Sequence, residues 1–313
     1  TTFSAEHTGK WMLLVYGMDA AALEGLATMA AIAANGTAMG AIVDNALLMH
    51  AIANSETAMQ RIANSQTAMQ RVANTRGAMD AIGRSRIARD AVQASPYYNS
   101  CIKENDMAIA KLVVALANLE SAGYSGMAGV AADSTAMTAV AASSVARNAI
   151  SASPYYDEKI KENDMAIAKL VVGFANLASA NYSSMTAVAA SSTAMTAVAA
   201  SATAMGKIAA VDAALSKLAA STTAMDALYA RKKKLNGGSA SKSGKFIILE
   251  ISASNAFNTS KYGYATLSDG SKPDWSSYLA KYAFFQKYPK YATYMLNDTD
   301  SDDYIYYFDI ASP

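Results

Sequence analysis

Carboxylates near the end of the chain are the residues that come closest to forming a metal site. Asp298, Asp300 and Asp302 alternate along the segment NDTDSDD. Alternate carboxylates suit a hard cation such as Ca²⁺, although the glycine and the distal glutamate of an EF-hand are missing. The segment therefore predicts either a calcium site or an acidic surface loop.

Tyrosine is concentrated in the same part of the chain, where ten of the 18 tyrosines follow Lys245. Tyrosine offers a large and stiff contact area at low entropy cost, so it is favoured at recognition surfaces. Some of these rings must form a small core, and the others are candidates for binding a glycan or a protein. The candidates are Tyr262, Tyr264, Trp275, Tyr278, Tyr288, Tyr291 and Tyr294.

Residues suited to catalysis are scarce. His7 and His50 are the only histidines, which excludes a Ser-His-Asp arrangement and a histidine-based zinc site. Glu104 and Asp106 lie beside Lys103 near a predicted helix start, where the helix dipole favours acidic side chains. The sequence has no Walker loop and no GxGxxG motif. It therefore predicts a protein that is not an enzyme and has no cofactor beyond the calcium considered above.

A ten-residue phrase fills most of the chain, as in TAMQRIANSQ from Thr57 and TAMTAVAASS from Thr135. The phrase contains a methionine, and Ile, Val or Leu follows it three residues later, as in Met59 and Ile62. The methionines of the phrase are Met29, Met39, Met49, Met59, Met69, Met79, Met127, Met137, Met185, Met195, Met205 and Met225. A fixed period of this kind indicates a repeat array, not an enzyme pocket.

Helix is the favoured conformation of these decads, because Ala, Met, Gln and Arg are good helix formers. Ten residues on a straight helix would shift the apolar stripe by ~80° per repeat, which a heptad supercoil does not tolerate. We therefore expect an overwound helix, or one that breaks and restarts at Asn64-Ser65 and at Ala199-Ala200-Ser201. The alternative is a β-solenoid, since Thr, Val and Ile suit strands.

Two copies of a longer segment interrupt the decads, at 95–126 and 153–184, with an offset of 58 residues. Both contain KENDMAIAKLVV, and an arginine replaces the usual methionine just before each copy, at Arg89 and Arg147. Each copy begins with Ser-Pro, which suits a cap followed by proline at the first helical position. Each insert is therefore predicted as a helix.

The rest of the chain is organised around this array. Residues 1–19 are a non-repetitive start, and 20–235 form the repeat shaft with its two inserts. The run Asn236 to Gly244, NGGSASKSG, predicts a flexible linker. Residues 245–313 predict a small α+β tip, with strands at FIILEIS and YIYYFDI and a short helix between them. The predicted fold class is mainly α, with a fibrous, coiled-coil-like oligomeric shaft and this tip, or a β-solenoid shaft as the alternative.

Composition bears on partners. Charged residues make up only 16%, alanine is abundant, and an alanine-rich rod buries little apolar area by itself. The missing burial must come from partner chains or from stacking, which favours a homo-oligomer. A net charge of +1 predicts neither nucleic-acid binding nor attraction to a membrane. The longest apolar run is too short for a membrane span, and the single Cys101 excludes an internal disulfide.

The phrase S-x-T-A-M-x-A-V-A, around Ser134–Ala141 and Ser191–Ala199, resembles low-complexity arrays in bacteriophage tail fibres and related contractile-tail fibres. The resemblance covers about two-thirds of the chain, and the 1–19 start is short for an attachment segment. It implies a homotrimer in a virion, made in the bacterial cytoplasm and joined to other virion proteins at its N-terminus. It also implies a C-terminal tip that binds a bacterial surface glycan or protein. The alternative is a non-adhesive virion component, such as a head fibre, scaffold or tail assembly protein.

Overall fold

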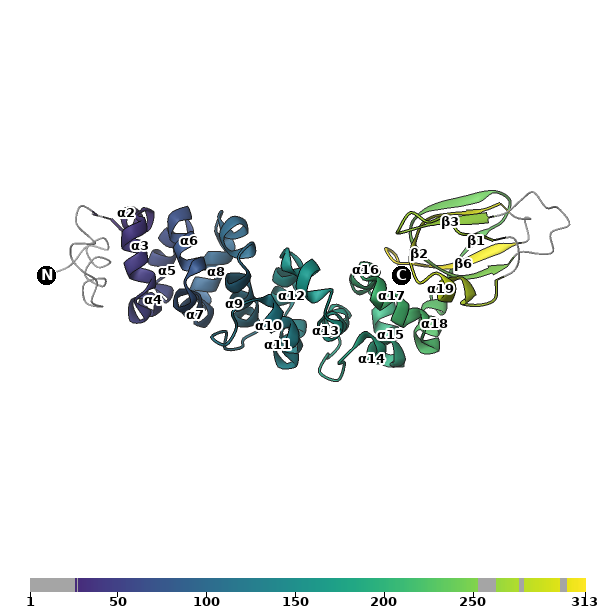
Figure 1. The fold of residues 1–313 in the computed structure, drawn as a ribbon, viewed down its shortest axis with the longest axis horizontal. Coiled ribbons are helices and arrows are strands. Elements are labelled where there is room, and N and C mark those ends of the chain that lie inside the picture. The colour runs from purple at the N-terminus through teal and green to yellow at the C-terminus, as the bar shows by residue number, and fades with distance from the viewer. Residues whose placement is uncertain (1–25, 27, 253–262, 276–278, 299–302) are drawn as a thin grey trace. The chain divides into compact units, whose positions relative to one another are not determined.

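The computed structural model describes residues 26, 28–252, 263–275, 279–298 and 303–313. The predicted N-terminal segment 1–19 lies outside these residues. The chain divides into two compact units, 1–163 and 164–313. Helices dominate both units, and the second also contains a small antiparallel sheet (Figure 1). The mainly α class with a small β region is therefore confirmed.

Each decad folds into one short α-helix, and a break of one or two residues separates it from the next. The helices of the first unit are α2 (Met29–Ala34), α3 (Gly36–Val43), α4 (Ala46–Ala53), α5 (Glu56–Ala63), α6 (Gln66–Asn74), α7 (Arg76–Arg84), α8 (Arg86–Ala94), α10 (Met127–Ala132), α11 (Ser134–Ala142) and α12 (Ser144–Ser151). Those of the second unit are α14 (Met185–Ala190), α15 (Ser192–Ala199), α16 (Ala202–Ala209), α17 (Asp212–Ala219) and α18 (Thr222–Tyr229).

Polar side chains at the breaks explain why the decads are separate helices. The Asn45 side chain accepts the Leu48 amide at 3.0 Å, and Ser65 accepts the Ala68 amide at 3.3 Å. These are N-cap hydrogen bonds, which satisfy amides that a helix leaves unpaired. The predicted restarts after Ser65 and Ser201 are confirmed, because α6 and α16 begin there. Of the two expected forms of helix, the described decads take the broken one, and they form neither the coiled-coil-like shaft nor the β-solenoid that the sequence suggested.

Helices that are three places apart in the sequence pack together, so three decads make one turn of a stack. This holds for α4 with α7, for α5 with α8, and for α15 with α18 in the second unit. Cap serines also join the turns. The Ser65 hydroxyl donates to the Ala33 carbonyl at 2.7 Å, and the Ser221 hydroxyl donates to the Ala189 carbonyl at 2.6 Å.

The repeated methionine and aliphatic residue fill the space between the turns. Met59 and Met195 are 0% exposed, and Ile62 is 1% exposed. Full burial of such a side chain stabilises a fold by about 1.5–3 kcal/mol. The composition required apolar burial either from stacking or from partner chains. Stacking of helices within one chain supplies it.

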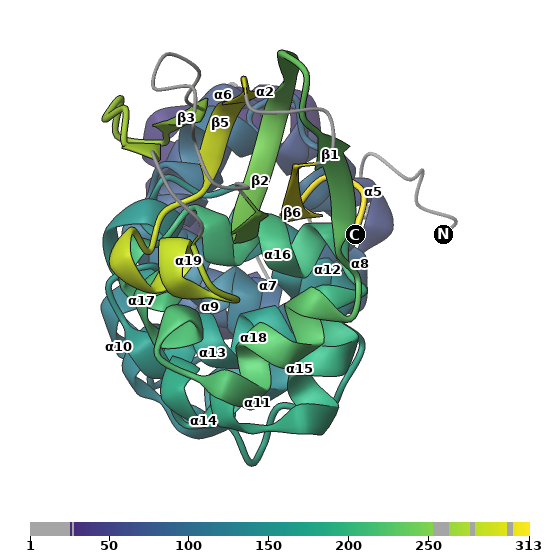
Figure 2. The ribbon, with the colours of Figure 1, turned by 90° about the vertical axis from the view of Figure 1, so that its right-hand side faces the viewer.

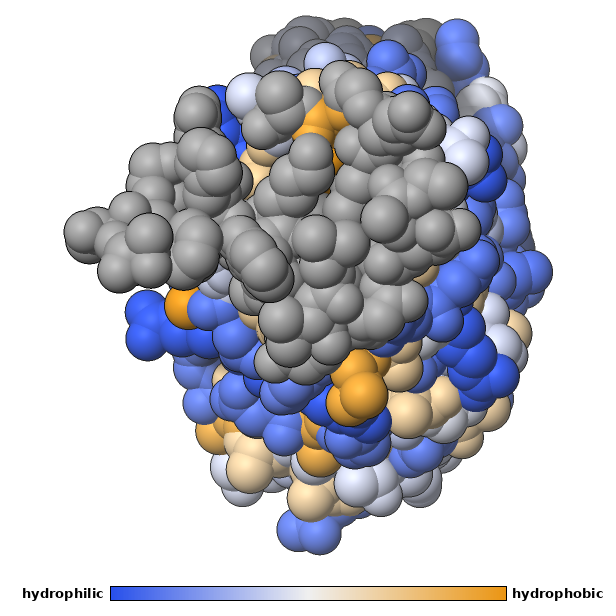
Figure 3. Space-filling view, turned by 90° about the vertical axis from the view of Figure 1, so that its left-hand side faces the viewer, coloured by the Kyte–Doolittle hydropathy of each residue, from blue (hydrophilic) through white to orange (hydrophobic). Residues whose placement is uncertain are grey.

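Figure 3 shows one face of the molecule coloured by hydropathy. The face in Figure 3 is mainly hydrophilic where it is not grey, and its hydrophobic residues form small, separate spots. No single helix of the described residues is long and apolar enough to cross a membrane, and only α3 and α4 together, bent by 100°, pass that test.

The inserts are not single helices, which corrects the prediction made from Ser-Pro. Ser95 ends α8, and a π-helical turn follows, η2 (Tyr98–Lys103). Asn105 then caps the α-helix α9 (Asp106–Leu116), and a loop runs from there to α10. The second copy likewise contains η3 (Tyr156–Ile160) and α13 (Asp164–Phe174). The break arises because Asn105 offers α9 a new N-cap acceptor for the Ala108 amide, at 3.1 Å.

In the described residues, six strands form the sheet of the second unit, and Figure 2 shows this sheet. They are β1 (Lys233–Asn236), β2 (Ala240–Ser252), β3 (Gly263–Leu267), β4 (Asp274–Trp275), β5 (Ala292–Asn297) and β6 (Tyr304–Asp309). Their order is β1-β6-β2-β5-β3-β4, and every neighbouring pair is antiparallel. A short helix, α19 (Ala283–Lys287), lies between β4 and β5 in the sequence.

The predicted strands at FIILEIS and YIYYFDI are confirmed as parts of β2 and β6. The predicted flexible linker 236–244 is wrong. Its second half is the start of β2, where Ser241 and Ser243 pair with Leu296 and Tyr294 of β5. Backbone pairing with β5 thus orders a Ser- and Lys-rich segment whose composition alone suggested a coil.

Candidate functional site

The two faces of the sheet differ in composition. One face packs into a core cluster, with Ile248, Ala265, Met295 and Ile305 all buried. Along β2 and β6 the opposite face is buried as well, at Ile247 and Phe308. Alternate residues of the same strands point to the opposite face, because side chains alternate along a strand. On that face Tyr264, Tyr294, Tyr304 and Tyr306 are half-buried. We call these four residues the tyrosine face.

The tyrosines of this face form two pairs. Tyr264 on β3 and Tyr294 on β5 have ring centroids 5.7 Å apart. Tyr304 and Tyr306, both on β6, have centroids 4.4 Å apart. A solvent-facing strand usually presents polar residues, whereas tyrosine presents a ring with a hydroxyl at its tip. Within the tyrosine face, the pair of Tyr264 and Tyr294 can therefore offer both apolar contact and hydrogen bonds to a ligand. Tyr304 and Tyr306 instead contact residues of their own unit, because the Tyr304 hydroxyl donates to Glu250 and Tyr306 packs edge-on against Tyr229.

The predicted binding residues have different places in the structure. Tyr264 and Tyr294 belong to the tyrosine face, whereas Trp275 is 3% exposed in the core, where it packs edge-on against Phe284. Tyr288 packs against the same core, and the Tyr291 ring lies 5.5 Å from the Lys245 ammonium. Trp275 is thus a core residue and not a surface contact. Tyr262 and Tyr278 lie outside the described residues.

Tyr304 and Tyr306 were missed as candidates, although the sequence contains a signal for them. In YIYYFD they alternate with Ile305 and Tyr307, which are buried, so both must share the opposite face. The strand itself was predicted, and the period of two would have assigned these rings to one surface.

The acidic segment is only partly described. The Asp298 carboxylate accepts a hydrogen bond from the Ser239 hydroxyl, and Asp300 and Asp302 lie outside the described residues. Among the residues that the structure describes, no three His, Cys, Asp or Glu side chains form a metal-binding group. Calcium binding here stays a prediction.

Polar contacts fix the sheet to the helix stack of its own unit. The Tyr229 hydroxyl at the end of α18 donates to Glu250 of β2 at 2.5 Å. Burial, followed by this hydrogen bond, raises the pKa of the Tyr229 phenol. The Lys281 ammonium pairs with Asp226 of α18 at 3.1 Å, and hydrogen bonds from Tyr282 and Lys281 lower the pKa of the Asp226 carboxyl.

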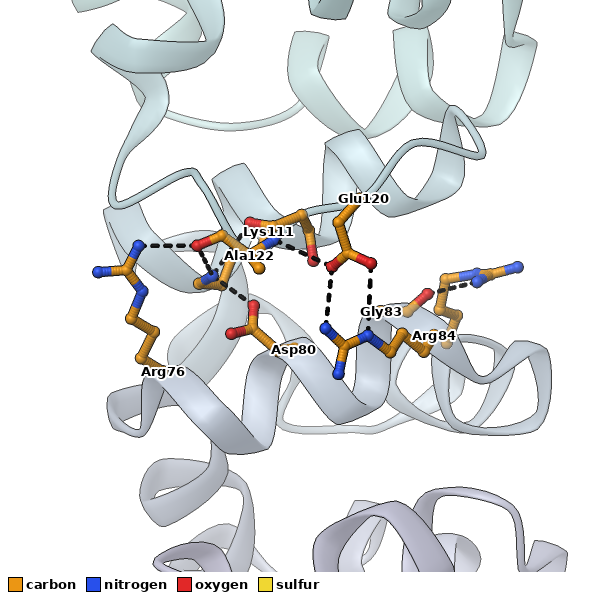
Figure 4. A network of polar contacts seen from close by, with 9 residues as sticks. Arg76, Asp80, Gly83, Arg84, Lys111, Glu120 and Ala122 are labelled. Carbon is orange, nitrogen blue, oxygen red and sulfur yellow. Dashed lines mark hydrogen bonds and ion pairs between the residues drawn. The ribbon is translucent and has the colours of Figure 1, made fainter. Parts of the chain in front are cut away.

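A second polar network surrounds a buried lysine in the first unit (Figure 4). The Lys111 side chain is 0% exposed, and its ammonium donates to the Asp80 carboxylate and to the carbonyls of Ser121 and Ala122. Arg76 donates to the same Ala122 carbonyl at 2.7 Å. Most of these acceptors are backbone atoms of the loop that follows α9. The network therefore holds that loop in place.

The second copy of the insert repeats several of these contacts 58 residues later. The Lys169 ammonium donates to the carbonyls of Ser179 and Ala180, both at 3.2 Å, and burial lowers the pKa of this lysine. Arg89 donates to the Gly83 carbonyl, and Arg147 donates to the Ala141 carbonyl. The arginines that replace methionine thus have a structural role, because each closes the C-terminal end of the preceding helix.

Comparison with known proteins adds no identification. No protein-family model matches the chain, and no curated protein matches it.

Proposed function

We propose that the protein is a structural fibre of a bacteriophage or phage-tail-like particle whose C-terminal sheet binds a receptor on the bacterial surface. The tyrosine face is the observation that carries the binding part of this proposal. Tyr264 and Tyr294 pair on the face opposite the buried Ala265 and Met295, so these two half-buried rings exceed what that core requires. Tyr304 and Tyr306 lie on the part of this face that α18 approaches, where Tyr306 packs edge-on against Tyr229. Aromatic surfaces of this kind are enriched at recognition sites.

The repeat stack supports the fibre part of the proposal. Each turn of three decads adds buried layers and polar caps, which suits a spacer. The sheet is fixed to this spacer through Tyr229, Glu250, Asp226 and Lys281. A receptor-binding element that is held rigidly loses less entropy on binding than one on a flexible linker.

A binding assay with the full chain tests the proposal. The labelled chain is incubated with a panel of bacterial envelope preparations, and the double variant Tyr264→Ser/Tyr294→Ser is compared with it. The matched control is Tyr97→Ser/Tyr182→Ser, which removes two half-buried tyrosines from the helical regions. We expect binding to at least one envelope, a loss of about tenfold or more for the sheet variant, and no loss for the control.

Absence of binding to every envelope would contradict the adhesive part of the proposal. A non-adhesive virion component, such as a head fibre or scaffold, would then be the better proposal. Self-association, with a trimer implied by the resemblance, belongs to the proposed function and is measured by sedimentation equilibrium of the same chain.

A further inference from the structure

Lysines and tyrosines interleave where α18 meets the edge of the sheet. The Lys232 ammonium lies 4.2 Å from the Tyr229 ring centroid and 5.1 Å from that of Tyr306. The Lys234 ammonium lies 5.0 Å from the Tyr304 ring centroid. These are cation–π distances, so the rings hold both ammonium groups in place.

Within the described residues, neither Lys232 nor Lys234 forms an ion pair with a carboxylate. Their neighbours differ in this respect, because Lys233 pairs with Asp309 at 3.4 Å and Lys281 pairs with Asp226 at 3.1 Å. The nearby Glu250 is 9% exposed, and the hydroxyls of Tyr229 and Tyr304 donate to it. Lys232 and Lys234 are themselves exposed, so they present positive charge to the solvent.

We propose that Lys232 and Lys234 bind acidic groups of a bacterial surface polysaccharide. This inference rests on the proposed function and assigns its ligand to a chemical class. An ammonium group is a compact charge that suits carboxylates, phosphates and sulfates. Because tyrosine rings already restrain these side chains, less side-chain entropy is lost when an anion binds.

The position of the lysines favours an acidic polysaccharide over two other ligands. A neutral sugar or a single-stranded nucleic acid would stack on exposed ring faces. Here lysines lie over the rings of Tyr229, Tyr304 and Tyr306, so those faces are already in contact. The positive charge of the two lysines therefore remains available to bind a ligand.

A simpler role for these lysines also has to be tested. β1 is one of the two edge strands of the described sheet; it contains Lys234 and directly follows Lys232. Lysine at an edge strand discourages pairing with another chain. If that is their whole role, replacing them increases aggregation but leaves polysaccharide binding unchanged.

The test uses the full chain and the double variant Lys232→Gln/Lys234→Gln. The control is Lys217→Gln/Lys272→Gln, which removes the same charge from exposed positions elsewhere in the second unit. Binding to alginate, dextran sulfate, neutral dextran and poly(dT) is measured at low and at physiological salt. We expect the wild type to bind an acidic polysaccharide, with affinity falling as salt rises, and not to bind neutral dextran. We expect the double variant to bind about tenfold more weakly and the control to match the wild type.

Equal binding by both variants, or tighter binding to poly(dT) than to either acidic polysaccharide, would overturn this inference. The proposed function is tested separately, by measuring envelope binding of the Tyr264→Ser/Tyr294→Ser variant. If Lys232→Gln/Lys234→Gln still binds the envelope while the tyrosine variant does not, the adhesive proposal holds and the acidic ligand is wrong.

Discussion

The Ser143 hydroxyl lies 3.0 Å from the Leu116 carbonyl oxygen and 3.3 Å from the Ala146 amide nitrogen. It accepts the amide as the N-cap of α12 and donates to the carbonyl at the end of α9, with which α12 packs. One side chain thus starts a helix and joins it to an earlier turn. Ser65, Ser85, Ser95, Ser201 and Ser221 likewise donate to a carbonyl of an earlier turn.

Replacing Ser143 with alanine should therefore be more costly than removing an ordinary cap. The variant loses the N-cap acceptor and leaves a part-buried carbonyl without its donor, so we expect the free energy of unfolding to fall by about 1–3 kcal/mol. Urea unfolding monitored by circular dichroism measures this change in the free energy of unfolding.

The neighbouring Ser144 provides the matched control, because it is the exposed first residue of α12. Ser144→Ala should change the free energy of unfolding by less than about 0.5 kcal/mol. Ser143→Asp keeps an acceptor but has no donor for Leu116, so it should remain less stable than the wild type. Equal stability of the two alanine variants would show that Ser143 does not join the turns.

The buried pair of Lys111 and Asp80 should respond differently from a surface pair. Asp80→Asn leaves the fully buried Lys111 ammonium without its counter-charge, which should cost about 3–5 kcal/mol. Arg84→Gln breaks the exposed pair with Glu120, whose atoms lie 3.3 Å apart, and should cost less than about 1 kcal/mol. Thermal unfolding of both variants makes the comparison. A smaller loss for Asp80→Asn than for Arg84→Gln would contradict the assigned network.

Asn118 follows the C-cap of α9, Ala117, and adopts the left-handed region with φ of 59°. The Leu119 amide bonds to the Val114 carbonyl and the Asn118 amide to the Ala115 carbonyl, which is the Schellman pattern. A β-branched residue is strained there, so Asn118→Val should lose about 1–2 kcal/mol of unfolding free energy. Asn118→Gly should be tolerated, because glycine adopts this conformation without strain. Equal effects of the two substitutions would argue against the left-handed cap.

The pair of Tyr124 and Asp133 should make stability depend on pH at both extremes. Burial, followed by the hydrogen bond to Asp133, raises the pKa of Tyr124 to about 12 from 10.0. Between these values the unfolded chain loses the phenol proton while the folded chain keeps it, so stability is complete below pH 10 and falls toward pH 12. Unfolding of wild type and Tyr124→Phe across this window measures the effect. The advantage of the wild type should shrink as the pH rises.

At acid pH the dependence has the opposite sign, because stability is lost as the pH falls. The Ala136 amide, followed by the Tyr124 hydroxyl, holds the pKa of the Asp133 carboxyl below its ordinary value. Its stabilisation is present above the unfolded pKa of about 4 and is lost as the pH falls through the lower folded pKa. Asp133→Asn should lose stability at neutral pH and converge with the wild type in acid. A constant difference between the two proteins would contradict the assignment.

The local structure of the decads could be predicted from the sequence, and their packing could not. Asn64-Ser65 and Ser201 marked helix breaks because short polar side chains cap helices. The stacking of α4 on α7 depends on contacts between residues about 30 apart, which no local pattern encodes. Ten residues do not match a whole number of helical turns, and this mismatch predicts strain in a continuous supercoil. The caps end the helix at each repeat, so the strain does not accumulate.

The candidate site was only partly predictable, for similar reasons. Tyr264 and Tyr294 could be named from composition, but composition cannot separate a surface ring from a core ring such as Trp275. The composition of Ala240–Ser243 is typical of a linker. The segment is ordered by pairing with β5, a strand more than 50 residues later, and composition does not reveal that pairing. The cation–π contacts of Lys232 and Lys234 likewise depend on β1 pairing with β6.

Photo-crosslinking of the full chain tests the central claim most directly. p-Benzoylphenylalanine is placed at Tyr294 of the tyrosine face in one protein and at Tyr97 of the first unit in another. Each is irradiated in the presence of a bacterial envelope preparation that the wild type binds. Our account predicts crosslinks to envelope material from position 294 and none from position 97. Crosslinks from position 97 alone, or from neither position despite binding, would contradict a receptor-binding role for this face.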